Sequence, residues 1–183
     1  TAEDIAKIAD ADMFVYVGGE SDGWVDSALK EATNKDMKVV NMLDALGTAV
    51  KEEEVVTGMQ AEEEEETEEG EEPEYDEHVW LSLRNAVTLT DVLSENIQEI
   101  DLANKEDYVE NAAEYVDKLN DLDGRYALTI SKSERQVILF GDRFPFRYMA
   151  DDYGLTYYAA FVGCSAESEA SFETITFLAQ KVD

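Results

Sequence analysis

The sequence has few basic residues: 14 Lys and Arg stand against 44 Asp and Glu, which gives a net charge of -30. Such a surface repels phosphate groups, which disfavours nucleic acid and anionic membrane surfaces as partners, and we expect no nucleic-acid partner. The acidity favours cations as ligands, a salty medium, or simply solubility. A hydrophobic share of 44% with 10% aromatics still indicates a folded protein.

Cysteine and histidine occur once each, as Cys164 and His78. One cysteine excludes an internal disulfide and any multi-cysteine zinc site. Cys164 stands where an apolar run meets a turn, which predicts a buried thiol, and no motif pairs it with a histidine. Paired carboxylates could act in acid–base catalysis, but this chain has so many carboxylates that no pair stands out as a catalytic candidate. We therefore expect no enzyme.

Long apolar runs are also missing. No stretch reaches the roughly 18 residues that a membrane span requires, and the chain does not open with a basic and then an apolar region. It begins at Thr1 without a methionine, which we interpret as a processed or trimmed piece. The length allows one ordinary domain or two small lobes.

Helix and strand patterns alternate along the first part of the chain. Thr1 is a good N-cap for the first helix. Apolar residues at helical spacing predict helices over residues 1–11 and 21–32, and short runs rich in apolar residues predict strands over 13–17 and 37–41. A turn-like or briefly helical segment follows over 43–50. This alternation is typical of a parallel sheet covered by helices.

The second part has the same alternation after two helices. Apolar residues at helical spacing predict a helix over 86–101 and a long helix capped by Asn104, with Tyr108, Ala112, Tyr115, Leu119 and Leu122 along one stripe. Strands follow at 136–140 and 155–162, and helices at 144–153 and 171–182, the last with Ile175, Leu178 and Ala179 facing inward.

The predicted fold class is therefore α/β, with two small Rossmann-like lobes that contain parallel sheets and are joined by a long α-helix. We expect a first lobe over residues 1–103, in which 51–77 form an acidic mobile loop. The joining helix covers 104–130, and a second α/β lobe starts over 131–183.

Two local patterns allow a structural and a functional interpretation. Gly18, Gly19 and Gly23 fit neither dinucleotide nor P-loop spacing, so we predict a tight strand-to-helix turn. Residues 62–74 are almost all glutamate and have nothing apolar to bury, which predicts a disordered or mobile segment. This segment is either a solubilising spacer or a weak collector of cations.

His78 directly follows the acidic run and precedes a helix. Its imidazole binds zinc or manganese well, and neighbouring carboxylates add oxygen ligands. An ordinary histidine in a loop or at a helix start explains the pattern equally well. On this stretch alone both interpretations stay open.

Four stretches together resemble one family, the metal-binding solute receptors of ABC importers for zinc and manganese. Residues 1–12 are similar to the family's first-lobe helix, and 77–86 to its D-P-H-x-W-L-D-P-x-N-A motif. Residues 104–123 match the joining helix through N-x-x-x-Y-x-x-N-x-x-x-Y, and 163–171 are similar to the G-x-S-x-E-x-E-P-S turn. The zinc receptors also carry a charged, often histidine-rich loop where this chain has glutamates.

The resemblance transfers one metal ligand, because His78 occupies the position of the motif's histidine. The family's first histidine would precede residue 1, and its final acidic ligand would follow residue 183. Its third ligand comes from an H-D-A-F-like turn, where this chain has no histidine. Asp142 supplies a carboxylate there, although Arg143 beside it could simply neutralise it.

The resemblance implies a monomeric, non-enzymatic protein, either a membrane-tethered lipoprotein or periplasmic. It would capture zinc or manganese, with zinc favoured, as the transported ligand, and deliver the ion to the membrane permease of an ABC importer. The alternative is an acidic α/β solute-binding or interaction domain that is indifferent to metal and whose charge serves solubility.

Overall fold

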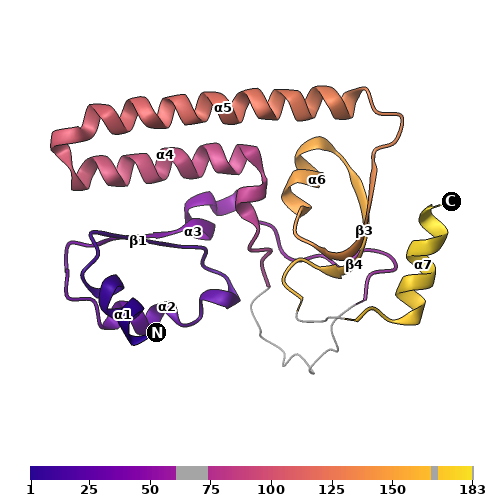
Figure 1. Ribbon diagram of the computed structural model, residues 1–183, viewed down its shortest axis with the longest axis horizontal. Coiled ribbons are helices and arrows are strands. Elements are labelled where there is room, and N and C mark those ends of the chain that lie inside the picture. The colour runs from indigo at the N-terminus through magenta and orange to yellow at the C-terminus, as the bar shows by residue number, and fades with distance from the viewer. Residues whose placement is uncertain (61–73, 166–168, 183) are drawn as a thin grey trace.

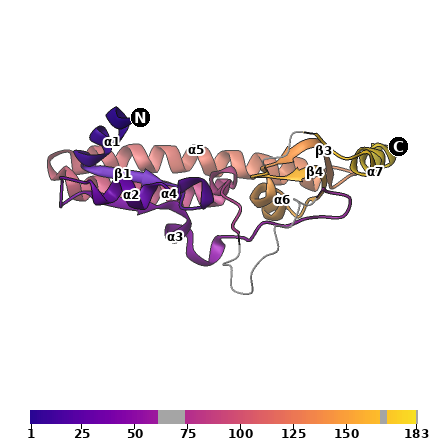
Figure 2. The same cartoon turned by 90° about the horizontal axis from the view of Figure 1, so that it is seen from below.

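The computed structural model describes residues 1–60, 74–165 and 169–182. Two α/β lobes lie in a row beneath a pair of long helices (Figure 1), and the view from below shows the same row with the two chain ends at opposite sides (Figure 2). The predicted fold class is confirmed: each lobe holds a two-stranded parallel sheet. Most of the predicted acidic segment, residues 61–73, lies outside the described part of the chain.

The first lobe begins with a capped helix. The side chain of Thr1 accepts a hydrogen bond from the backbone N–H of Asp4, as predicted. The elements are α1 (Ala2–Ala9), β1 (Met13–Tyr16), α2 (Val25–Lys30), β2 (Lys38–Asn41) and α3 (Met42–Leu46). The helix predicted over 21–32 is shorter, because a separate 3-10 turn, Glu20–Asp22, precedes α2.

The turn after β1 has the structural role predicted for it. Gly18 adopts a φ of 103°, which glycine tolerates best, and the Asp22 carboxylate accepts the N–H groups of Val17 and Gly18 at 2.8 and 3.0 Å. Gly19 lies so close to Glu77 that a Cβ there would be 2.2 Å from its Oε1. The turn therefore fits against the segment that precedes His78.

Two helices run antiparallel along the top of the molecule: the first lies over the first lobe, and the second extends over both lobes (Figure 1). They are α4 (Leu83–Ile100), capped by Ser82, and α5 (Lys105–Ser131). Asn104 is the N-cap residue of α5, as predicted, but its side chain makes no capping hydrogen bond to the helix. Asn104 instead donates to Asp101 at 2.7 Å, and Tyr108 donates to the same carboxylate oxygen at 2.9 Å, which closes the turn between the helices.

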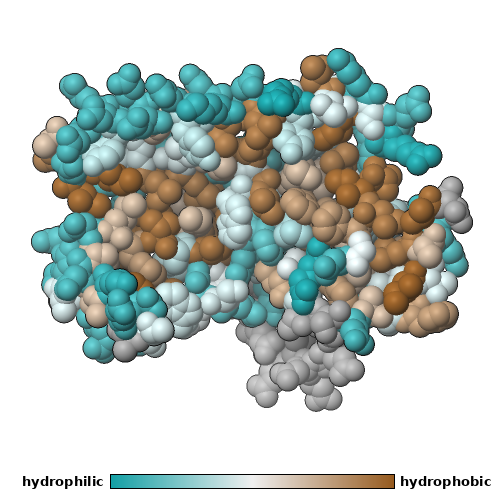
Figure 3. Space-filling view, in the orientation of Figure 1, coloured by the Kyte–Doolittle hydropathy of each residue, from teal (hydrophilic) through white to brown (hydrophobic). Residues whose placement is uncertain are grey.

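The outer edge of α5 is hydrophilic and apolar residues gather below it (Figure 3). Leu119 is buried, but Tyr115 is 53% exposed, so only part of the predicted stripe packs in the core. Six acidic residues along α4 and α5 are exposed: Asp91, Glu95, Glu99, Glu106, Glu110 and Glu114. Among the described helices, none combines the length and hydrophobicity that crossing a membrane would require.

The second lobe contains β3 (Val137–Phe144), α6 (Arg147–Tyr153), β4 (Thr156–Val162) and α7 (Phe172–Val182). β3 continues beyond its predicted end, so Phe144 is the last residue of a strand and not the first of a helix. Its ring stacks on Tyr157 of β4 with centroids 4.0 Å apart. β4 is the buried strand that its composition predicted.

The inward face of α7 differs from the prediction. Leu178 is buried as expected, but Ile175 is 54% exposed and Ala179 is also exposed. Thr174 is buried instead. Thr174 and Leu178 are four residues apart, so they share the face that packs on the sheet, and Ile175 lies beside it.

Candidate functional site

His78 lies in a short segment that contacts both lobes. Toward the first lobe, Glu77 Oε1 accepts the backbone N–H of Ser21 at 2.9 Å. Toward the second lobe, the ring of His78 lies against Gly163, where a Cβ would come within 3.0 Å of Nδ1. Val79 follows, fully buried, and anchors the segment before α4 begins. The fold therefore places the histidine between the lobes.

The side chain of Asp76 orients the His78 ring. Its Oδ1 accepts the backbone N–H of His78 at 2.8 Å and lies 3.1 Å from His78 Nδ1. Asp76 is only 3% exposed, and its hydrogen bond raises the pKa of the imidazole. With Nδ1 engaged by the carboxylate, Nε2 is the nitrogen left to bind a ligand, since within the described residues it makes no hydrogen bond.

Tyr148 of the second lobe supports this arrangement from behind. Its hydroxyl donates to the carbonyl of Asp76 at 2.8 Å and accepts the backbone N–H of Lys51 at 3.1 Å. Burial raises the pKa of Tyr148 to about 12, so the group acts as a neutral hydroxyl. The backbone on either side of the acidic segment is thus fixed to α6.

Cys164 follows β4 and lies beside the same ring. Its sulfur is 3.9 Å from His78 Nδ1, and its backbone N–H donates to Glu53 Oε1 at 3.3 Å. The predicted buried thiol is wrong, because Cys164 is exposed. Its histidine neighbour is brought close by the fold and by no sequence motif. Desolvation of the sulfur raises the pKa of the Cys164 thiol to about 12, so in the free protein it is protonated.

Glu53 reaches the site because residues 51–60 cross to the second lobe. Met59 of this segment is buried in the core around Phe144 and Tyr157, and Gln60 donates to the carbonyl of Ala160 at 2.9 Å. Burial raises the pKa of the Glu53 carboxyl. A third segment of the chain therefore adds a carboxylate near Cys164.

Asp142 occupies a different environment. It is 73% exposed on β3 and contacts its neighbour Arg143, whose backbone N–H donates to Oδ1 at 2.8 Å and whose Nη1 lies 3.6 Å from it. Within the described residues it makes no hydrogen bond or ion pair with His78. The structure does not bring the two candidate ligands together.

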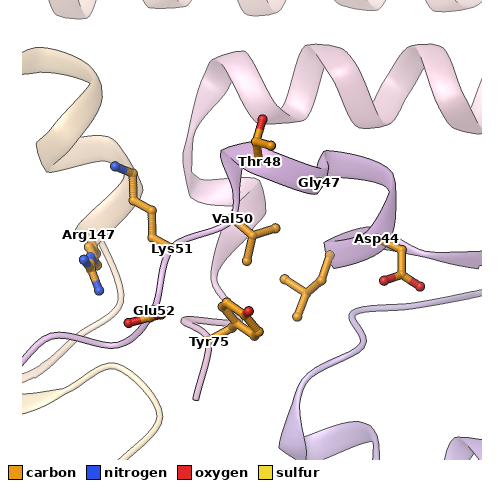
Figure 4. Close-up of a pocket in the computed structure, with 9 residues that line it drawn as sticks. Asp44, Gly47, Thr48, Val50, Lys51, Glu52, Tyr75 and Arg147 are labelled. Carbon is orange, nitrogen blue, oxygen red and sulfur yellow. The ribbon is translucent and has the colours of Figure 1, made fainter. Parts of the chain in front are cut away.

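A depression of about 630 Å³ lies beside the site, below the end of α3 (Figure 4). Lys51, Glu52, Tyr75 and Arg147 line it together with residues of the α3 region. Lys51 pairs with Asp151 at 2.7 Å, and Arg147 Nη2 lies 3.5 Å from Glu54. Both partner carboxylates lie outside its wall, and His78 is not part of that wall either, so this depression is separate from the histidine site.

The sequence pointed to His78 because the chain has one histidine, but it did not single out Asp76, Glu53 or Cys164 as neighbours of that ring. Asp76 stands at the D of the D-P-H pattern, which was the available signal. Within residues 1–60, 74–165 and 169–182, no group of three or more His, Cys, Asp and Glu side chains is arranged to hold a metal ion. The described geometry is therefore an imidazole oriented by Asp76, with the Cys164 thiol beside it and the Glu53 carboxylate near that cysteine.

Comparison with known proteins identifies the family. The family model for the periplasmic zinc-uptake complex component A, ZnuA, matches residues 1–183. The high-affinity zinc uptake system protein ZnuA of Bacillus subtilis is 35% identical over 180 residues, which are 97% of this chain and 54% of that protein. The zinc-binding protein AdcA of Streptococcus pyogenes serotype M3 is 30% identical over 186 residues, which cover 100% of this chain.

A solved structure agrees with these relatives. The Zn(II)-bound ZnuA-like domain of Streptococcus pneumoniae AdcA has a TM-score of 0.68 and 30% identity, and the match covers 100% of this chain and 60% of that one. The chain spans 36% of the length of Streptococcus pyogenes AdcA. With its whole length matched by the family model, the chain belongs to the ZnuA family of zinc-uptake proteins.

Proposed function

We propose that this protein captures zinc outside the cytoplasm and delivers it to an ABC importer, with His78 as a ligand of the transported ion. The observation that carries the proposal is the imidazole held between the two lobes by Asp76. A carboxylate on one ring nitrogen fixes the tautomer and makes the other nitrogen a better metal ligand. The protein binds and releases an ion and performs no catalysis.

Zinc is favoured over manganese as the transported ligand. Imidazole nitrogen suits zinc, and manganese prefers a more oxygen-rich set. The relatives carry zinc in their names, including a zinc-binding lipoprotein of Streptococcus pneumoniae. That name and the family's periplasmic description support an extracytoplasmic location for this protein.

Zinc takes four ligands, so His78 needs companions. Asp142 joins the site only if it separates from Arg143 and turns toward the histidine. We propose further that the chain divides into lobes over residues 1–103 and 131–183 and a joining helix over 104–130. Such a rigid joining helix restricts hinge motion, so uptake and release proceed by small movements of lobes and loops. We expect the protein to act as a monomer, and its partner to be the importer's membrane permease.

Titration calorimetry of zinc and manganese into the full-length protein tests the proposal. His78→Ala should abolish tight zinc binding, whereas Asp91→Asn, on the exposed face of α4, should leave it unchanged. Asp142→Asn decides whether that carboxylate takes part. Tight zinc binding that survives in His78→Ala would refute the assignment.

A second candidate, an acidic domain indifferent to metal, is favoured by the row of exposed carboxylates on α4 and α5. It predicts only weak cation binding that added salt screens away. Zinc binding that persists at high salt and depends on His78 would exclude it.

A further inference from the structure

We propose that Asp152 is a positioning residue for zinc capture: together with Tyr148 on the same face of α6, it clamps residues 76–82 at both ends and thereby fixes the orientation of His78. This inference rests on the proposed function, because it concerns the ion bound at His78. The clamp adds no ligand to the ion. It holds the imidazole in its binding orientation before the ion arrives.

Two side chains of α6 hold the segment that contains the histidine. Before His78, the hydroxyl of Tyr148 donates to the carbonyl of Asp76 at 2.8 Å. After His78, the hydroxyl of Ser82 donates to Asp152 Oδ2 at 2.5 Å. Residues 148 and 152 are four positions apart and so share one face of the helix. One helix of the second lobe therefore contacts the segment on both sides of the imidazole.

The backbone between His78 and Ser82 forms a closed turn. The N–H of Leu81 donates to the carbonyl of His78 at 3.0 Å, and Asn85 Nδ2 donates to the carbonyl of Val79 at 3.2 Å. Ser82 is 2% exposed, and its Oγ also accepts the N–H of Asn85 at 3.1 Å, which caps α4. A displacement of Ser82 would therefore move the backbone of His78 with it.

The Asp152 carboxylate is held in place by a polar network at the junction of α4, α5 and α6. Its side chain is 17% exposed, and its Oδ1 lies 3.6 Å from Arg84 Nη1. Arg84 Nε lies 3.6 Å from Asp123 Oδ1, which also accepts the hydroxyl of Tyr153 at 2.9 Å. Without Asp152, the buried hydroxyl of Ser82 would lose its acceptor, and leaving a buried donor unpaired is costly.

Ser82 departs from the family motif quoted for residues 77–86, which has aspartate at this position. A carboxylate caps a helix as well as a hydroxyl does, because capping requires only an acceptor oxygen. An ionised carboxylate has no proton to donate to Asp152, however. The serine thus allows one side chain to cap α4 and to bond to α6 at the same time.

Nuclear magnetic resonance of the imidazole nitrogens measures the orientation directly, and the signals are unambiguous because the chain has one histidine. In the metal-free, full-length native protein, at a pH where the ring is neutral, we expect one tautomer with the proton on Nδ1, facing Asp76. In Asp152→Ala the two nitrogen signals should move toward each other as the tautomers mix. Tyr148→Phe, at the other end of the clamp, should shift them in the same direction.

Zinc affinity gives the functional readout. The zinc dissociation constant of Asp152→Ala, from calorimetric competition, should rise by roughly 2- to 30-fold. Asp152→Asn keeps an oxygen acceptor of the same shape and should restore both readouts. Asp151→Ala removes the same charge from the same helix, but that carboxylate pairs with Lys51, so both readouts should stay native.

Ser82→Ala removes the same hydrogen bond from the other side and repeats the test if Asp152→Ala does not fold. It also removes the cap of α4, so its ring signals, and not its stability, are compared with those of the native protein.

The outcomes separate the two proposals. Native ring signals in Asp152→Ala, native zinc affinity in that variant, or equal effects of Asp151→Ala would overturn the role of Asp152, and zinc capture would stand as long as binding requires His78. Zinc binding that is unaffected by His78→Ala would overturn both zinc capture at His78 and the positioning role.

Discussion

At the scale of single residues, the site depends on Asp76 as much as on His78. The Asp76 carboxylate is almost fully buried. Its Oδ1 accepts the backbone N–H of His78 and lies within hydrogen-bonding distance of Nδ1 of the ring. Asp76→Asn keeps the shape but replaces the charged acceptor by a weaker, neutral one. We expect zinc affinity to fall roughly 10- to 100-fold, measured by calorimetric competition. Asp91→Asn is the matched control, and equal affinities in the two variants would show that Asp76 has no role in binding.

The hydroxyl of Tyr148 should stabilise the fold around the site. Tyr148→Phe removes the donor to the Asp76 carbonyl, which is buried, and the acceptor for Lys51 N–H, which is partly buried. We expect the free energy of unfolding to fall by about 1–3 kcal/mol in urea denaturation. Tyr115→Phe, at an exposed position of α5, should change it by less than about 0.5 kcal/mol. Equal effects of the two substitutions would contradict this account.

Residue identity alone singles out one residue of the proposed site. His78 stands out because it is unique, but Cys164 lies 86 positions further along the chain, and only the fold brings the two together. Without that contact, a single cysteine after an apolar strand has the pattern of a buried thiol. Asp142 shows the opposite case: it lies at the expected turn, yet it faces solvent beside Arg143.

At the scale of secondary-structure elements, two glycines in contrasting settings give a matched prediction. Gly19→Ala would place a Cβ 2.2–2.5 Å from the Glu77 side chain, which is buried and accepts the N–H of Ser21. We expect a loss of about 1–3 kcal/mol through displacement of Glu77. Gly124 lies inside α5, and a Cβ added there would have no neighbouring atom within 4 Å, so Gly124→Ala should add about 0.5–1 kcal/mol. Urea unfolding of both variants checks the opposite signs, and a stabilised Gly19→Ala would contradict the close contact.

The turn between α4 and α5 should respond to acid. Hydrogen bonds from Asn104 and Tyr108 lower the pKa of Asp101. A carboxyl whose pKa is lowered on folding stabilises the native state above its unfolded pKa, near 3.9, and loses that contribution as pH falls through the folded value. The stability difference between native protein and Asp101→Asn should therefore be full at neutral pH and shrink below about pH 4. Urea unfolding across that range measures it, and a constant difference would exclude the ionised carboxylate as its source.

The order of elements was predictable and their ends were not. Helical spacing indicated the helices and short continuous apolar runs, such as residues 13–17, indicated the strands; their alternation predicted the parallel sheets. β3 extends to Phe144 because it pairs with β4 there, in the register Phe144 opposite Val162. The split before α2 depends on the Asp22 carboxylate, which holds the preceding backbone. Such tertiary contacts leave no periodic pattern in the local sequence, so the ends of these elements could not be predicted from it.

At the scale of the whole molecule, residues 76–78 connect the two lobes. The side chain of Glu77 accepts a hydrogen bond from the first lobe. In the second lobe, the Tyr148 hydroxyl donates to the Asp76 carbonyl, and Gly163 lies against the ring of His78. The two-lobe arrangement with a long helix could be predicted from element order together with the family resemblance. The sharing of one site among three segments could not, since it depends on how residues 51–60 cross between lobes.

Because the site joins both lobes, zinc should stabilise the entire protein. At free zinc 100 times the dissociation constant, binding to the native state alone adds about 2.7 kcal/mol. For a protein of this size that corresponds to a rise in melting temperature of roughly 5–10 °C. Magnesium is the matched control: it screens the charge of -30 but does not need an imidazole, so it should raise the melting temperature of native protein and His78→Ala equally. The additional rise with zinc should be absent in His78→Ala. An equal zinc shift in both proteins would assign the stabilisation to general screening of the acidic surface and not to a bound ion between the lobes.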